Sequence, residues 1–221
     1  MIIFTAIMGS SRDRLHPAVA PPDPAGRPSR FVCFTDDPGL KADGWEILPP
    51  KWRHADPRRT SRWHKFMPHI LFPGEPFSLW HDGTNQLTAN PWSLVDQFLV
   101  GEREIAVCRH PDRSCVYQEL EMCIRLHYDT EAIMRKQVDR YREEGYPPRR
   151  GLFEMALVLR AHTKQIIEFN EAVWREINVG SVRDQLAVNY VAWKLGLVAA
   201  YFPGYRGASP FFKFYPHQKG A

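Results

Sequence analysis

Asp82 is a candidate ligand-binding residue because of its place in the sequence. It directly follows the apolar run Phe77-Ser78-Leu79-Trp80-His81 and precedes Gly83. A carboxylate after a strand can face a ligand, and a following glycine lets the backbone turn closely around it. An Asp-Gly pair is also a common turn signal. The position of Asp82 alone therefore allows two interpretations, a ligand-binding carboxylate and a residue that only forms a turn.

Basic residues upstream of Asp82 have helical spacing. Arg62 and Lys65 lie three residues apart in RRTSRWHKFMPH, so they share a face if the segment is helical, and His69 lies one turn further along. Guanidinium and ammonium groups bind phosphate well. The spacing predicts a face that grips a diphosphate; the alternative is an ordinary solvated helix surface.

A further basic group lies in CRHPDRSCVYQE, between a predicted strand and a predicted helix. Free backbone N–H groups at the helix start, together with Arg109, His110 and Arg113, are suited to an anion or a sugar hydroxyl. The alternative for this segment is structural, with Asp112 or Ser114 capping the helix.

The stretch Ser181-Val182-Arg183-Asp184 opens the last predicted helix. Asp184 lies three residues after the expected N-cap, Ser181, which is the spacing of a capping-box variant. Capping explains neither Arg183 nor Gln185, and these two remain candidates for chemistry.

Strands and helices alternate along the chain. The expected strands are 2–8, 31–34, 45–48, 77–81, 105–108 and 152–159. The expected helices are 60–71, one beginning after Pro91, 114–127, 130–144, 164–177 and 182–195. The first of these helices is expected to be kinked or short because of Pro68, with Thr60 as its N-cap. The proline-rich segment 16–30 is expected to be a surface loop or a flexible lid. Alternation predicts a mostly parallel sheet covered on both faces, with ligands bound beyond the carboxyl ends of the strands. Those ends are Gly9-Ser10, Asp36-Asp37 and His81-Asp82.

Bulk properties limit the class of protein. The 221 residues fit one domain, 1–221, and 44% hydrophobic with 24% charged residues is ordinary globular usage. The sequence has no run of about 18 apolar residues and its four cysteines form no CxxC pair, so we expect no membrane span, reduced thiols and a cytoplasmic location. A net charge of +4 permits an anionic ligand. The sequence has no GxSxG elbow, P-loop, dinucleotide fingerprint or HExxH, so hydrolase, kinase and dehydrogenase readings lack their usual motifs.

Several blocks resemble the plant mucilage and turgor-regulation glycosyltransferase-like family, once listed as a domain of unknown function: AIMGSSRDRL, FVCFTDD, RWHKFMPHILFP, SLWHDG, IAVCRHPDRSCVYQE, GLFEMALVLRAH and SVRDQL. The later blocks are also similar to the glycogenin and lipopolysaccharide-galactosyltransferase superfamily. In that superfamily an arginine-containing helix precedes a strand ending in Asp-x-Asp, and a distant Asp-Gln-Asp-x-x-Asn follows. The counterparts here are Arg62 or Lys65, Asp82, and Asp184-Gln185 with Asn189.

The resemblance implies a GT-A-like (Rossmann-like) α/β fold and an enzyme that moves a sugar from a nucleotide donor, UDP-linked, to an acceptor hydroxyl with retention. The implied donor-binding residues are Ala6, Gly9, Thr35, Asp36, Arg62, Lys65, Asp82, His110 and Arg113. The implied catalytic residues are Asp184, Gln185 and Arg183. The acceptor classes compatible with this reading are a glycan, a lipid, a protein side chain and a modified base in DNA.

The resemblance also implies a divalent cation, Mn²⁺ or Mg²⁺, bound by Asp82 and by His217. Such a cation would neutralise the charge that develops on the leaving group. The sequence departs from the superfamily here, because Thr84 replaces the second aspartate of Asp-x-Asp. A metal-independent enzyme that uses Arg62 and Lys65 is therefore an open alternative. Two other function classes stay open, a hydrolase, since lipid-amidase activity has been described in the plant family, and a non-catalytic sugar- or nucleotide-binding module.

Overall fold

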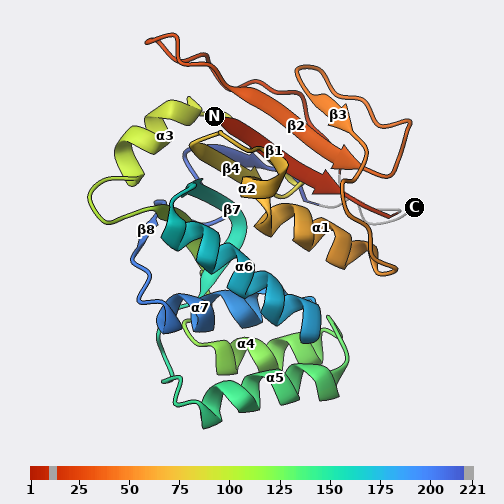
Figure 1. Ribbon diagram of the computed structural model, residues 1–221, viewed down its shortest axis with the longest axis vertical. Coiled ribbons are helices and arrows are strands. Elements are labelled where there is room, and N and C mark those ends of the chain that lie inside the picture. The colour runs from red at the N-terminus through yellow and green to blue at the C-terminus, as the bar shows by residue number, and fades with distance from the viewer. Residues whose placement is uncertain (10–13, 217–221) are drawn as a thin grey trace.

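A mixed sheet forms the centre of the structure, a computed structural model that describes residues 1–9 and 14–216 (Figure 1). Within those residues the sheet has seven strands in the order β3-β2-β1-β4-β7-β6-β8. Their bounds are β1 Ile2–Ile7, β2 Arg30–Thr35, β3 Glu46–Leu48, β4 Phe77–His81, β6 Ile105–Arg109, β7 Phe153–Ala161 and β8 Ala199–Tyr201. The first four in this order are parallel, β7 runs antiparallel to both of its neighbours, and β8 is parallel to β6. The predicted mostly parallel α/β sheet is confirmed.

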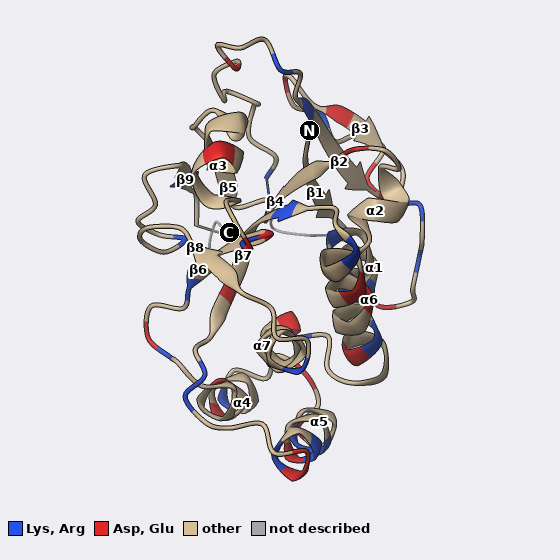
Figure 2. Cartoon of the chain, turned by 60° about the vertical axis from the view of Figure 1, so that its left-hand side comes forward, with Lys and Arg blue, Asp and Glu red and all other residues tan. Residues whose placement is uncertain are grey.

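The two faces of the sheet are covered by different elements. Alternate residues of β1 point to opposite faces, so Phe4 packs in one hydrophobic cluster and Ile3 in the other. The first face is covered by α1 (Pro57–Phe66) and α6 (Lys164–Val179), and α4 (Val116–Arg125), α5 (Glu131–Glu143) and α7 (Asp184–Lys194) group at one end of the molecule. The second face is covered by α3 (Pro91–Phe98), as Figure 2 shows. Both faces of β1 are therefore buried, which is why its sequence is a continuous apolar run.

The predicted helix 60–71 is two helices, α1 and α2 (Pro68–Leu71), with Met67 between them. Pro68 has no N–H to continue the helical ladder, so the expected break occurs there. The expected N-cap, Thr60, is wrong: α1 begins at Pro57, because the Asp56 side chain accepts from the Arg58 N–H and proline suits the first helical position. The Thr60 hydroxyl instead accepts from the His54 N–H at 2.9 Å.

The expected cap of the last helix also differs. The N-cap position of α7 is Arg183 and carries no side-chain capping bond. Ser181 stabilises the turn just before it, because its hydroxyl accepts from the Arg183 N–H at 3.1 Å. The α4 helix likewise begins after Cys115 with no side-chain cap, so neither Asp112 nor Ser114 caps it.

Three short strands were not expected. They are β8 and the antiparallel pair β5 (Asn85–Leu87) and β9 (Phe212–Phe214), each of three residues, which is too short for a period-2 pattern to stand out. The β5–β9 pair brings the C-terminal segment next to the turn that follows β4.

The proline-rich segment 16–30 is confirmed as a loop without regular structure until β2 begins at Arg30. Two hydrogen bonds tie it to the segment before β3: the Ala18 N–H donates to the Asp43 carbonyl, and the Trp45 indole donates to the His16 carbonyl. Across the described part of the chain, each helix is too short or too polar to span a membrane. All four cysteines are buried and free.

Candidate active site

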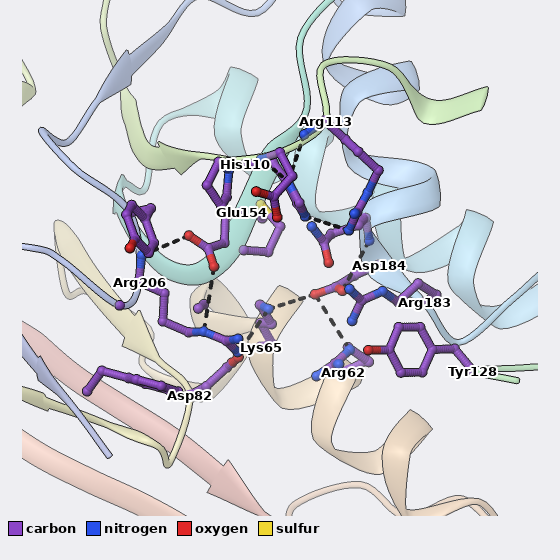
Figure 3. Close-up of a pocket in the computed structure, with 18 residues that line it drawn as sticks. Arg62, Lys65, Asp82, His110, Arg113, Tyr128, Glu154, Arg183, Asp184 and Arg206 are labelled. Atoms are coloured by element: carbon purple, nitrogen blue, oxygen red, sulfur yellow. Dashed lines mark hydrogen bonds and ion pairs between the residues drawn. The ribbon is translucent and has the colours of Figure 1, made fainter. Parts of the chain in front are cut away.

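A cavity of about 330 Å³ opens where the ends of β4 and β7 approach α1 and α7 (Figure 3). Its wall is strongly charged. The basic residues are Arg62, Lys65, Arg113, Arg183 and Arg206, the acidic ones are Asp82, Asp112, Glu154 and Asp184, and His110, Gln185, Tyr128 and Tyr205 also line it. Eight of the residues singled out from the sequence meet here: Arg62, Lys65, Asp82, His110, Arg113, Arg183, Asp184 and Gln185.

Lys65 is at the centre of the cluster. Its side chain is 2% exposed, and its Nζ lies 2.6 Å from Asp184 Oδ2 and 3.8 Å from Asp82 Oδ1. Arg62 stands one helical turn earlier, with Nε 3.5 Å from the same Asp184 oxygen. The predicted shared face of Arg62 and Lys65 is confirmed. Both side chains project from the last two turns of α1 towards the first residue of α7, where a carboxylate also suits the helix dipole.

The ion pair shifts the pKa of both partners. Burial alone would raise the pKa of Asp184, but Arg62, Lys65 and Arg183 outweigh burial and hold that pKa well below its usual value. Burial lowers the pKa of Lys65, and the negative charges of Asp184 and Asp82 oppose the shift. Asp184 is thus an ionised group that fixes Lys65 in place.

Asp82 combines the two roles left open for it. Its carbonyl accepts from the Asn85 N–H at 2.9 Å, which makes it the first residue of a turn, and its N–H donates to Ala156 of β7. Its side chain, 30% exposed, faces the cavity, where Oδ1 accepts from the Trp80 indole at 2.8 Å. Asp82 is therefore both a turn residue and a cavity carboxylate.

Glu119 forms ion pairs with two arginines of the cavity wall, Arg113 and Arg183. It lies on α4, is fully buried, and contacts Arg113 Nε at 2.6 Å and Arg183 at 3.2 Å. Arg183 is also stacked over the Tyr128 ring at 4.6 Å. His110 organises its loop, because its Nδ1 accepts from the Arg113 N–H at 3.2 Å. Arg113 and Arg183 are thereby presented to the cavity by one buried carboxylate.

Glu154 and Arg206 are cavity residues that sequence reasoning missed. A bulge in the β6–β7 pairing sets Glu154 opposite Cys108, and bulges of this kind re-aim a side chain. The Arg206 N–H donates to Glu154 Oε2 at 2.9 Å, and the Arg206 guanidinium lies 3.6 Å from Oε1. Burial raises the pKa of Glu154, and Arg206 opposes that rise. A charged residue inside the apolar strand 152–159 was a usable signal for Glu154; Arg206, in an irregular loop, offered none.

The other expected donor residues lie apart from this cavity, at the ends of β1 and β2. The Gly9 N–H donates to both oxygens of Asp36 at 3.0 Å, the Ala6 carbonyl accepts from the Ser61 hydroxyl at 3.1 Å, and the Thr35 hydroxyl accepts from the Asp37 N–H at 3.1 Å. None of the four lines the cavity as the described residues form it. Ser10 and His217 lie outside the described residues.

Three further candidates make structural contacts. Arg109 stacks over the Tyr201 ring at 4.1 Å. His69 Nε2 lies 3.7 Å from Glu171 of α6. The Asn189 side chain accepts from the Phe153 N–H at 2.8 Å, which ties α7 to the start of β7. None of the three is among the described residues that line the cavity.

A divalent cation bound by a protein needs several ligands that point to one place. No three His, Cys, Asp or Glu side chains among residues 1–9 and 14–216 come together as a set that would hold a metal ion. Thr84 contributes no carboxylate beside Asp82, and the Lys65 ammonium lies 3.8 Å from Asp82 Oδ1. The described residues therefore supply fewer than three His, Cys, Asp or Glu ligands for a cation at Asp82.

Comparison with known proteins agrees with this fold and with the resemblance noted in the sequence. The chain is 28% identical over 151 residues to the probable hexosyltransferase MUCI70 of Arabidopsis thaliana, covering 64% of this chain and 26% of that protein. It is 30% identical over 138 residues to the alkaline ceramidase TOD1 of the same plant, covering 58% of this chain and 30% of that protein. The chain thus matches less than a third of the length of either relative.

Among solved structures, mouse xyloside xylosyltransferase 1 in its apo form superposes with a TM-score of 0.51 and 11% identity, over 90% of this chain and 83% of that one. At such low identity the likeness concerns the fold, which is GT-A-like. Residues 44–203 match the model of the TOD1/MUCI70 glycosyltransferase-like domain. This chain therefore belongs to the TOD1/MUCI70 glycosyltransferase-like domain family.

Proposed function

We propose that the chain transfers a sugar, a hexose, from a UDP-linked donor to an acceptor hydroxyl. One observation carries the proposal: five basic side chains converge on a single cavity at the carboxyl ends of the strands, in a fold of the GT-A kind. Ligands of open α/β sheets bind at this edge. The cavity is lined with charged and hydrogen-bonding groups, which suits a diphosphate and a sugar.

Arg62 and Lys65 are proposed to bind the diphosphate. Both belong to the rigid helix α1, and Asp184 holds them towards the cavity. Fixed cations stabilise the negative charge that grows on the leaving diphosphate, and they do so without reorganising during the reaction. His110 and Arg113 would extend the same basic wall along the donor.

Gln185 is proposed to lie at the reacting face. Its side-chain amide donates to the Phe153 carbonyl at 3.3 Å, which anchors it to the cavity wall. In the retaining reaction that we propose, the acceptor oxygen bonds to the anomeric carbon as the bond from that carbon to the phosphate oxygen breaks. The nucleoside diphosphate leaves with the electron pair, and the acceptor proton passes to one of its oxygens. Arg183 would stabilise the same charge, and Asp184 acts by positioning Lys65.

The end of the sheet formed by β1 and β2 is proposed to hold the nucleoside. Gly9 and Asp36 meet there, next to the start of α1, and Ala6 and Thr35 lie on the same two strands. This arrangement would spread the donor along the sheet edge, with the nucleoside over β1 and β2 and the sugar in the cavity beyond β4.

The relative named as an alkaline ceramidase suggests a second function, amide hydrolysis. That reaction needs an activated water, supplied in many hydrolases by a metal. Three of the four cavity carboxylates, Asp82, Glu154 and Asp184, are each close to a basic group, and the described residues contain no three-ligand metal cluster. We therefore favour the transferase over the hydrolase.

A thermal-shift panel of UDP, GDP, CDP and their sugars tests the proposal. A ligand present at a hundred times its Kd stabilises the folded protein by about 2.7 kcal/mol, which is easily measured. We expect a shift with UDP and one UDP-sugar, lost in Arg62→Ala and kept in Lys136→Ala, an exposed residue of α5. Release of UDP on adding an acceptor would separate an enzyme from a binding module. No shift with any nucleotide would overturn the proposal.

A further inference from the structure

We propose that the donor diphosphate binds without a divalent cation, because Lys65, Arg62 and Arg206 take the place of the metal. The inference rests on the proposed function and concerns the same cavity. Figure 3 shows these three side chains around Asp82 and Asp184.

Lys65 lies beside the carboxylate that would hold a cation. Its ammonium lies 3.8 Å from Asp82 Oδ1, and that oxygen already accepts from the Trp80 indole at 2.8 Å. A divalent ion on Asp82 would sit next to this ammonium, which is 2% exposed and held by Asp184 at 2.6 Å. Two like charges that share the same carboxylate repel each other.

Among residues 1–9 and 14–216, the other carboxylates near Asp82 are engaged with basic side chains. Mg²⁺ demands an octahedron of oxygen atoms, usually with one or two carboxylates from the protein. The side chain that follows Asp82 by two residues is the hydroxyl of Thr84, which is buried. Glu154 is paired with Arg206, and Asp184 with Lys65 and Arg62. Glu154 and Asp184 are thus committed to basic side chains.

Arg62 has a donor that lacks a partner. Its Nε is buried and makes no hydrogen bond with the residues that the structure describes, although Asp184 Oδ2 lies 3.5 Å away as an ion-pair partner. A buried guanidinium N–H without an acceptor is costly, and a phosphate oxygen in the cavity would satisfy it. Arg206 is 42% exposed, so its guanidinium can turn from Glu154 to a bound phosphate.

The substitution Asp82→Asn distinguishes metal-dependent binding of the diphosphate from binding by Lys65. If a cation bridges Asp82 and the diphosphate, Asp82→Asn abolishes the tight binding that the metal provides. If Lys65 does the binding, Asp82 is one more negative charge beside an anionic ligand. Replacing it with asparagine keeps the side-chain volume and removes the repulsion.

The test is calorimetric titration of UDP into the wild type and Asp82→Asn, each in EDTA and in MnCl₂. We expect the wild-type Kd to agree within about twofold in the two buffers, and Asp82→Asn to bind UDP equally well or up to about tenfold more tightly in EDTA. Arg62→Ala should weaken binding about tenfold or more in both buffers, with Lys136→Ala as the matched control. Thermal unfolding of each variant checks that it is folded.

Metal-dependent binding would overturn the inference. Tightening of wild-type binding by about tenfold or more in MnCl₂ would show that a metal contributes. Loss of that tightening in Asp82→Asn would place the metal on Asp82. Absence of UDP binding in either buffer would refute the proposed function itself, which is a distinct result from metal-dependent binding.

Discussion

The polar residues at the ends of β1 and β2 have different partners from those in the cavity beyond β4, the other half of the sheet's carboxyl edge. At the ends of β1 and β2, Asp36 binds the Gly9 backbone and Thr35 binds the Asp37 backbone. Beyond β4, in contrast, Lys65 and Asp184 come from helices far apart in the sequence and meet at the cavity. Both halves have polar residues after buried strands. A position just after a buried strand therefore predicts that a residue lies at the carboxyl edge of the sheet. The tertiary contacts of its side chain decide whether that side chain faces the cavity.

The difference has a physical cause. The polar groups of the β1 and β2 ends are satisfied locally by the backbone of the adjoining strand or turn. In the cavity half, the end of α1 and the start of α7 bring buried charges together, and a buried charge requires a partner. The second half thus depends on tertiary ion pairs, and perturbing these pairs should have the larger effect on both stability and donor binding.

Lys65→Met should have the largest effect. It leaves Asp184, whose side chain is 3% exposed, without its closest counter-ion. Breaking a buried pair in this way costs about 3–5 kcal/mol, and we also expect donor binding to be lost. Urea unfolding measures the first effect and UDP titration the second. Lys136→Met, on the exposed face of α5, should change stability by less than about 0.5 kcal/mol. A loss of less than about 1 kcal/mol in the free energy of unfolding of Lys65→Met would mean that the Lys65–Asp184 pair does not stabilise the fold.

Glu119→Gln should have an intermediate effect. The fully buried Glu119 contacts both Arg113 and Arg183, and the amide keeps its shape but not its charge. The two arginines are partly exposed, so water compensates in part, and we expect a loss of about 2–3 kcal/mol, at or below the low end of the range for broken buried pairs. Donor affinity should fall as well, because the arginines lose their fixed direction.

The matched control is Glu121→Gln on the same helix. Glu121 pairs with Arg135 at the surface, with 61% of its side chain exposed. Surface pairs contribute little, so its unfolding midpoint in urea should stay close to that of the wild type. Equal effects of the two substitutions would contradict the role of Glu119 in holding the arginines.

Asp36→Ala should have the smallest effect on folding and a selective effect on binding. It removes the acceptor of the exposed Gly9 N–H, which is a loss of about 1 kcal/mol. If the β1 and β2 ends hold the nucleoside, the affinity for UDP should fall while the affinity for inorganic diphosphate stays unchanged. Competition titrations with the two ligands measure this split. A parallel loss for both ligands would show that the two halves of the edge do not act separately.

Much of the site was predictable because its signals are local. The spacing of Arg62 and Lys65 predicts a shared helical face, and the apolar run before Asp82 predicts a strand end, and both are observed. Glu154 was missed because the apolar run around it indicates only a buried strand, while the bulge that turns it to the cavity depends on pairing with β6. Arg206 was missed because a loop residue acquires its position from contacts such as the β5–β9 pair.

By itself, the sequence determined the alternation of strands and helices, the kink at Pro68 and the likeness to one family. These follow from propensity, periodicity and motif, which act over a few residues. Only the tertiary structure decided which charges become partners. Lys65 and Asp184 are 119 positions apart, and Arg183 and Glu119 are 64 apart. No local pattern links residues so distant; they meet because the sheet and its helices bury their apolar faces first, and the charges carried into the interior must then pair with one another.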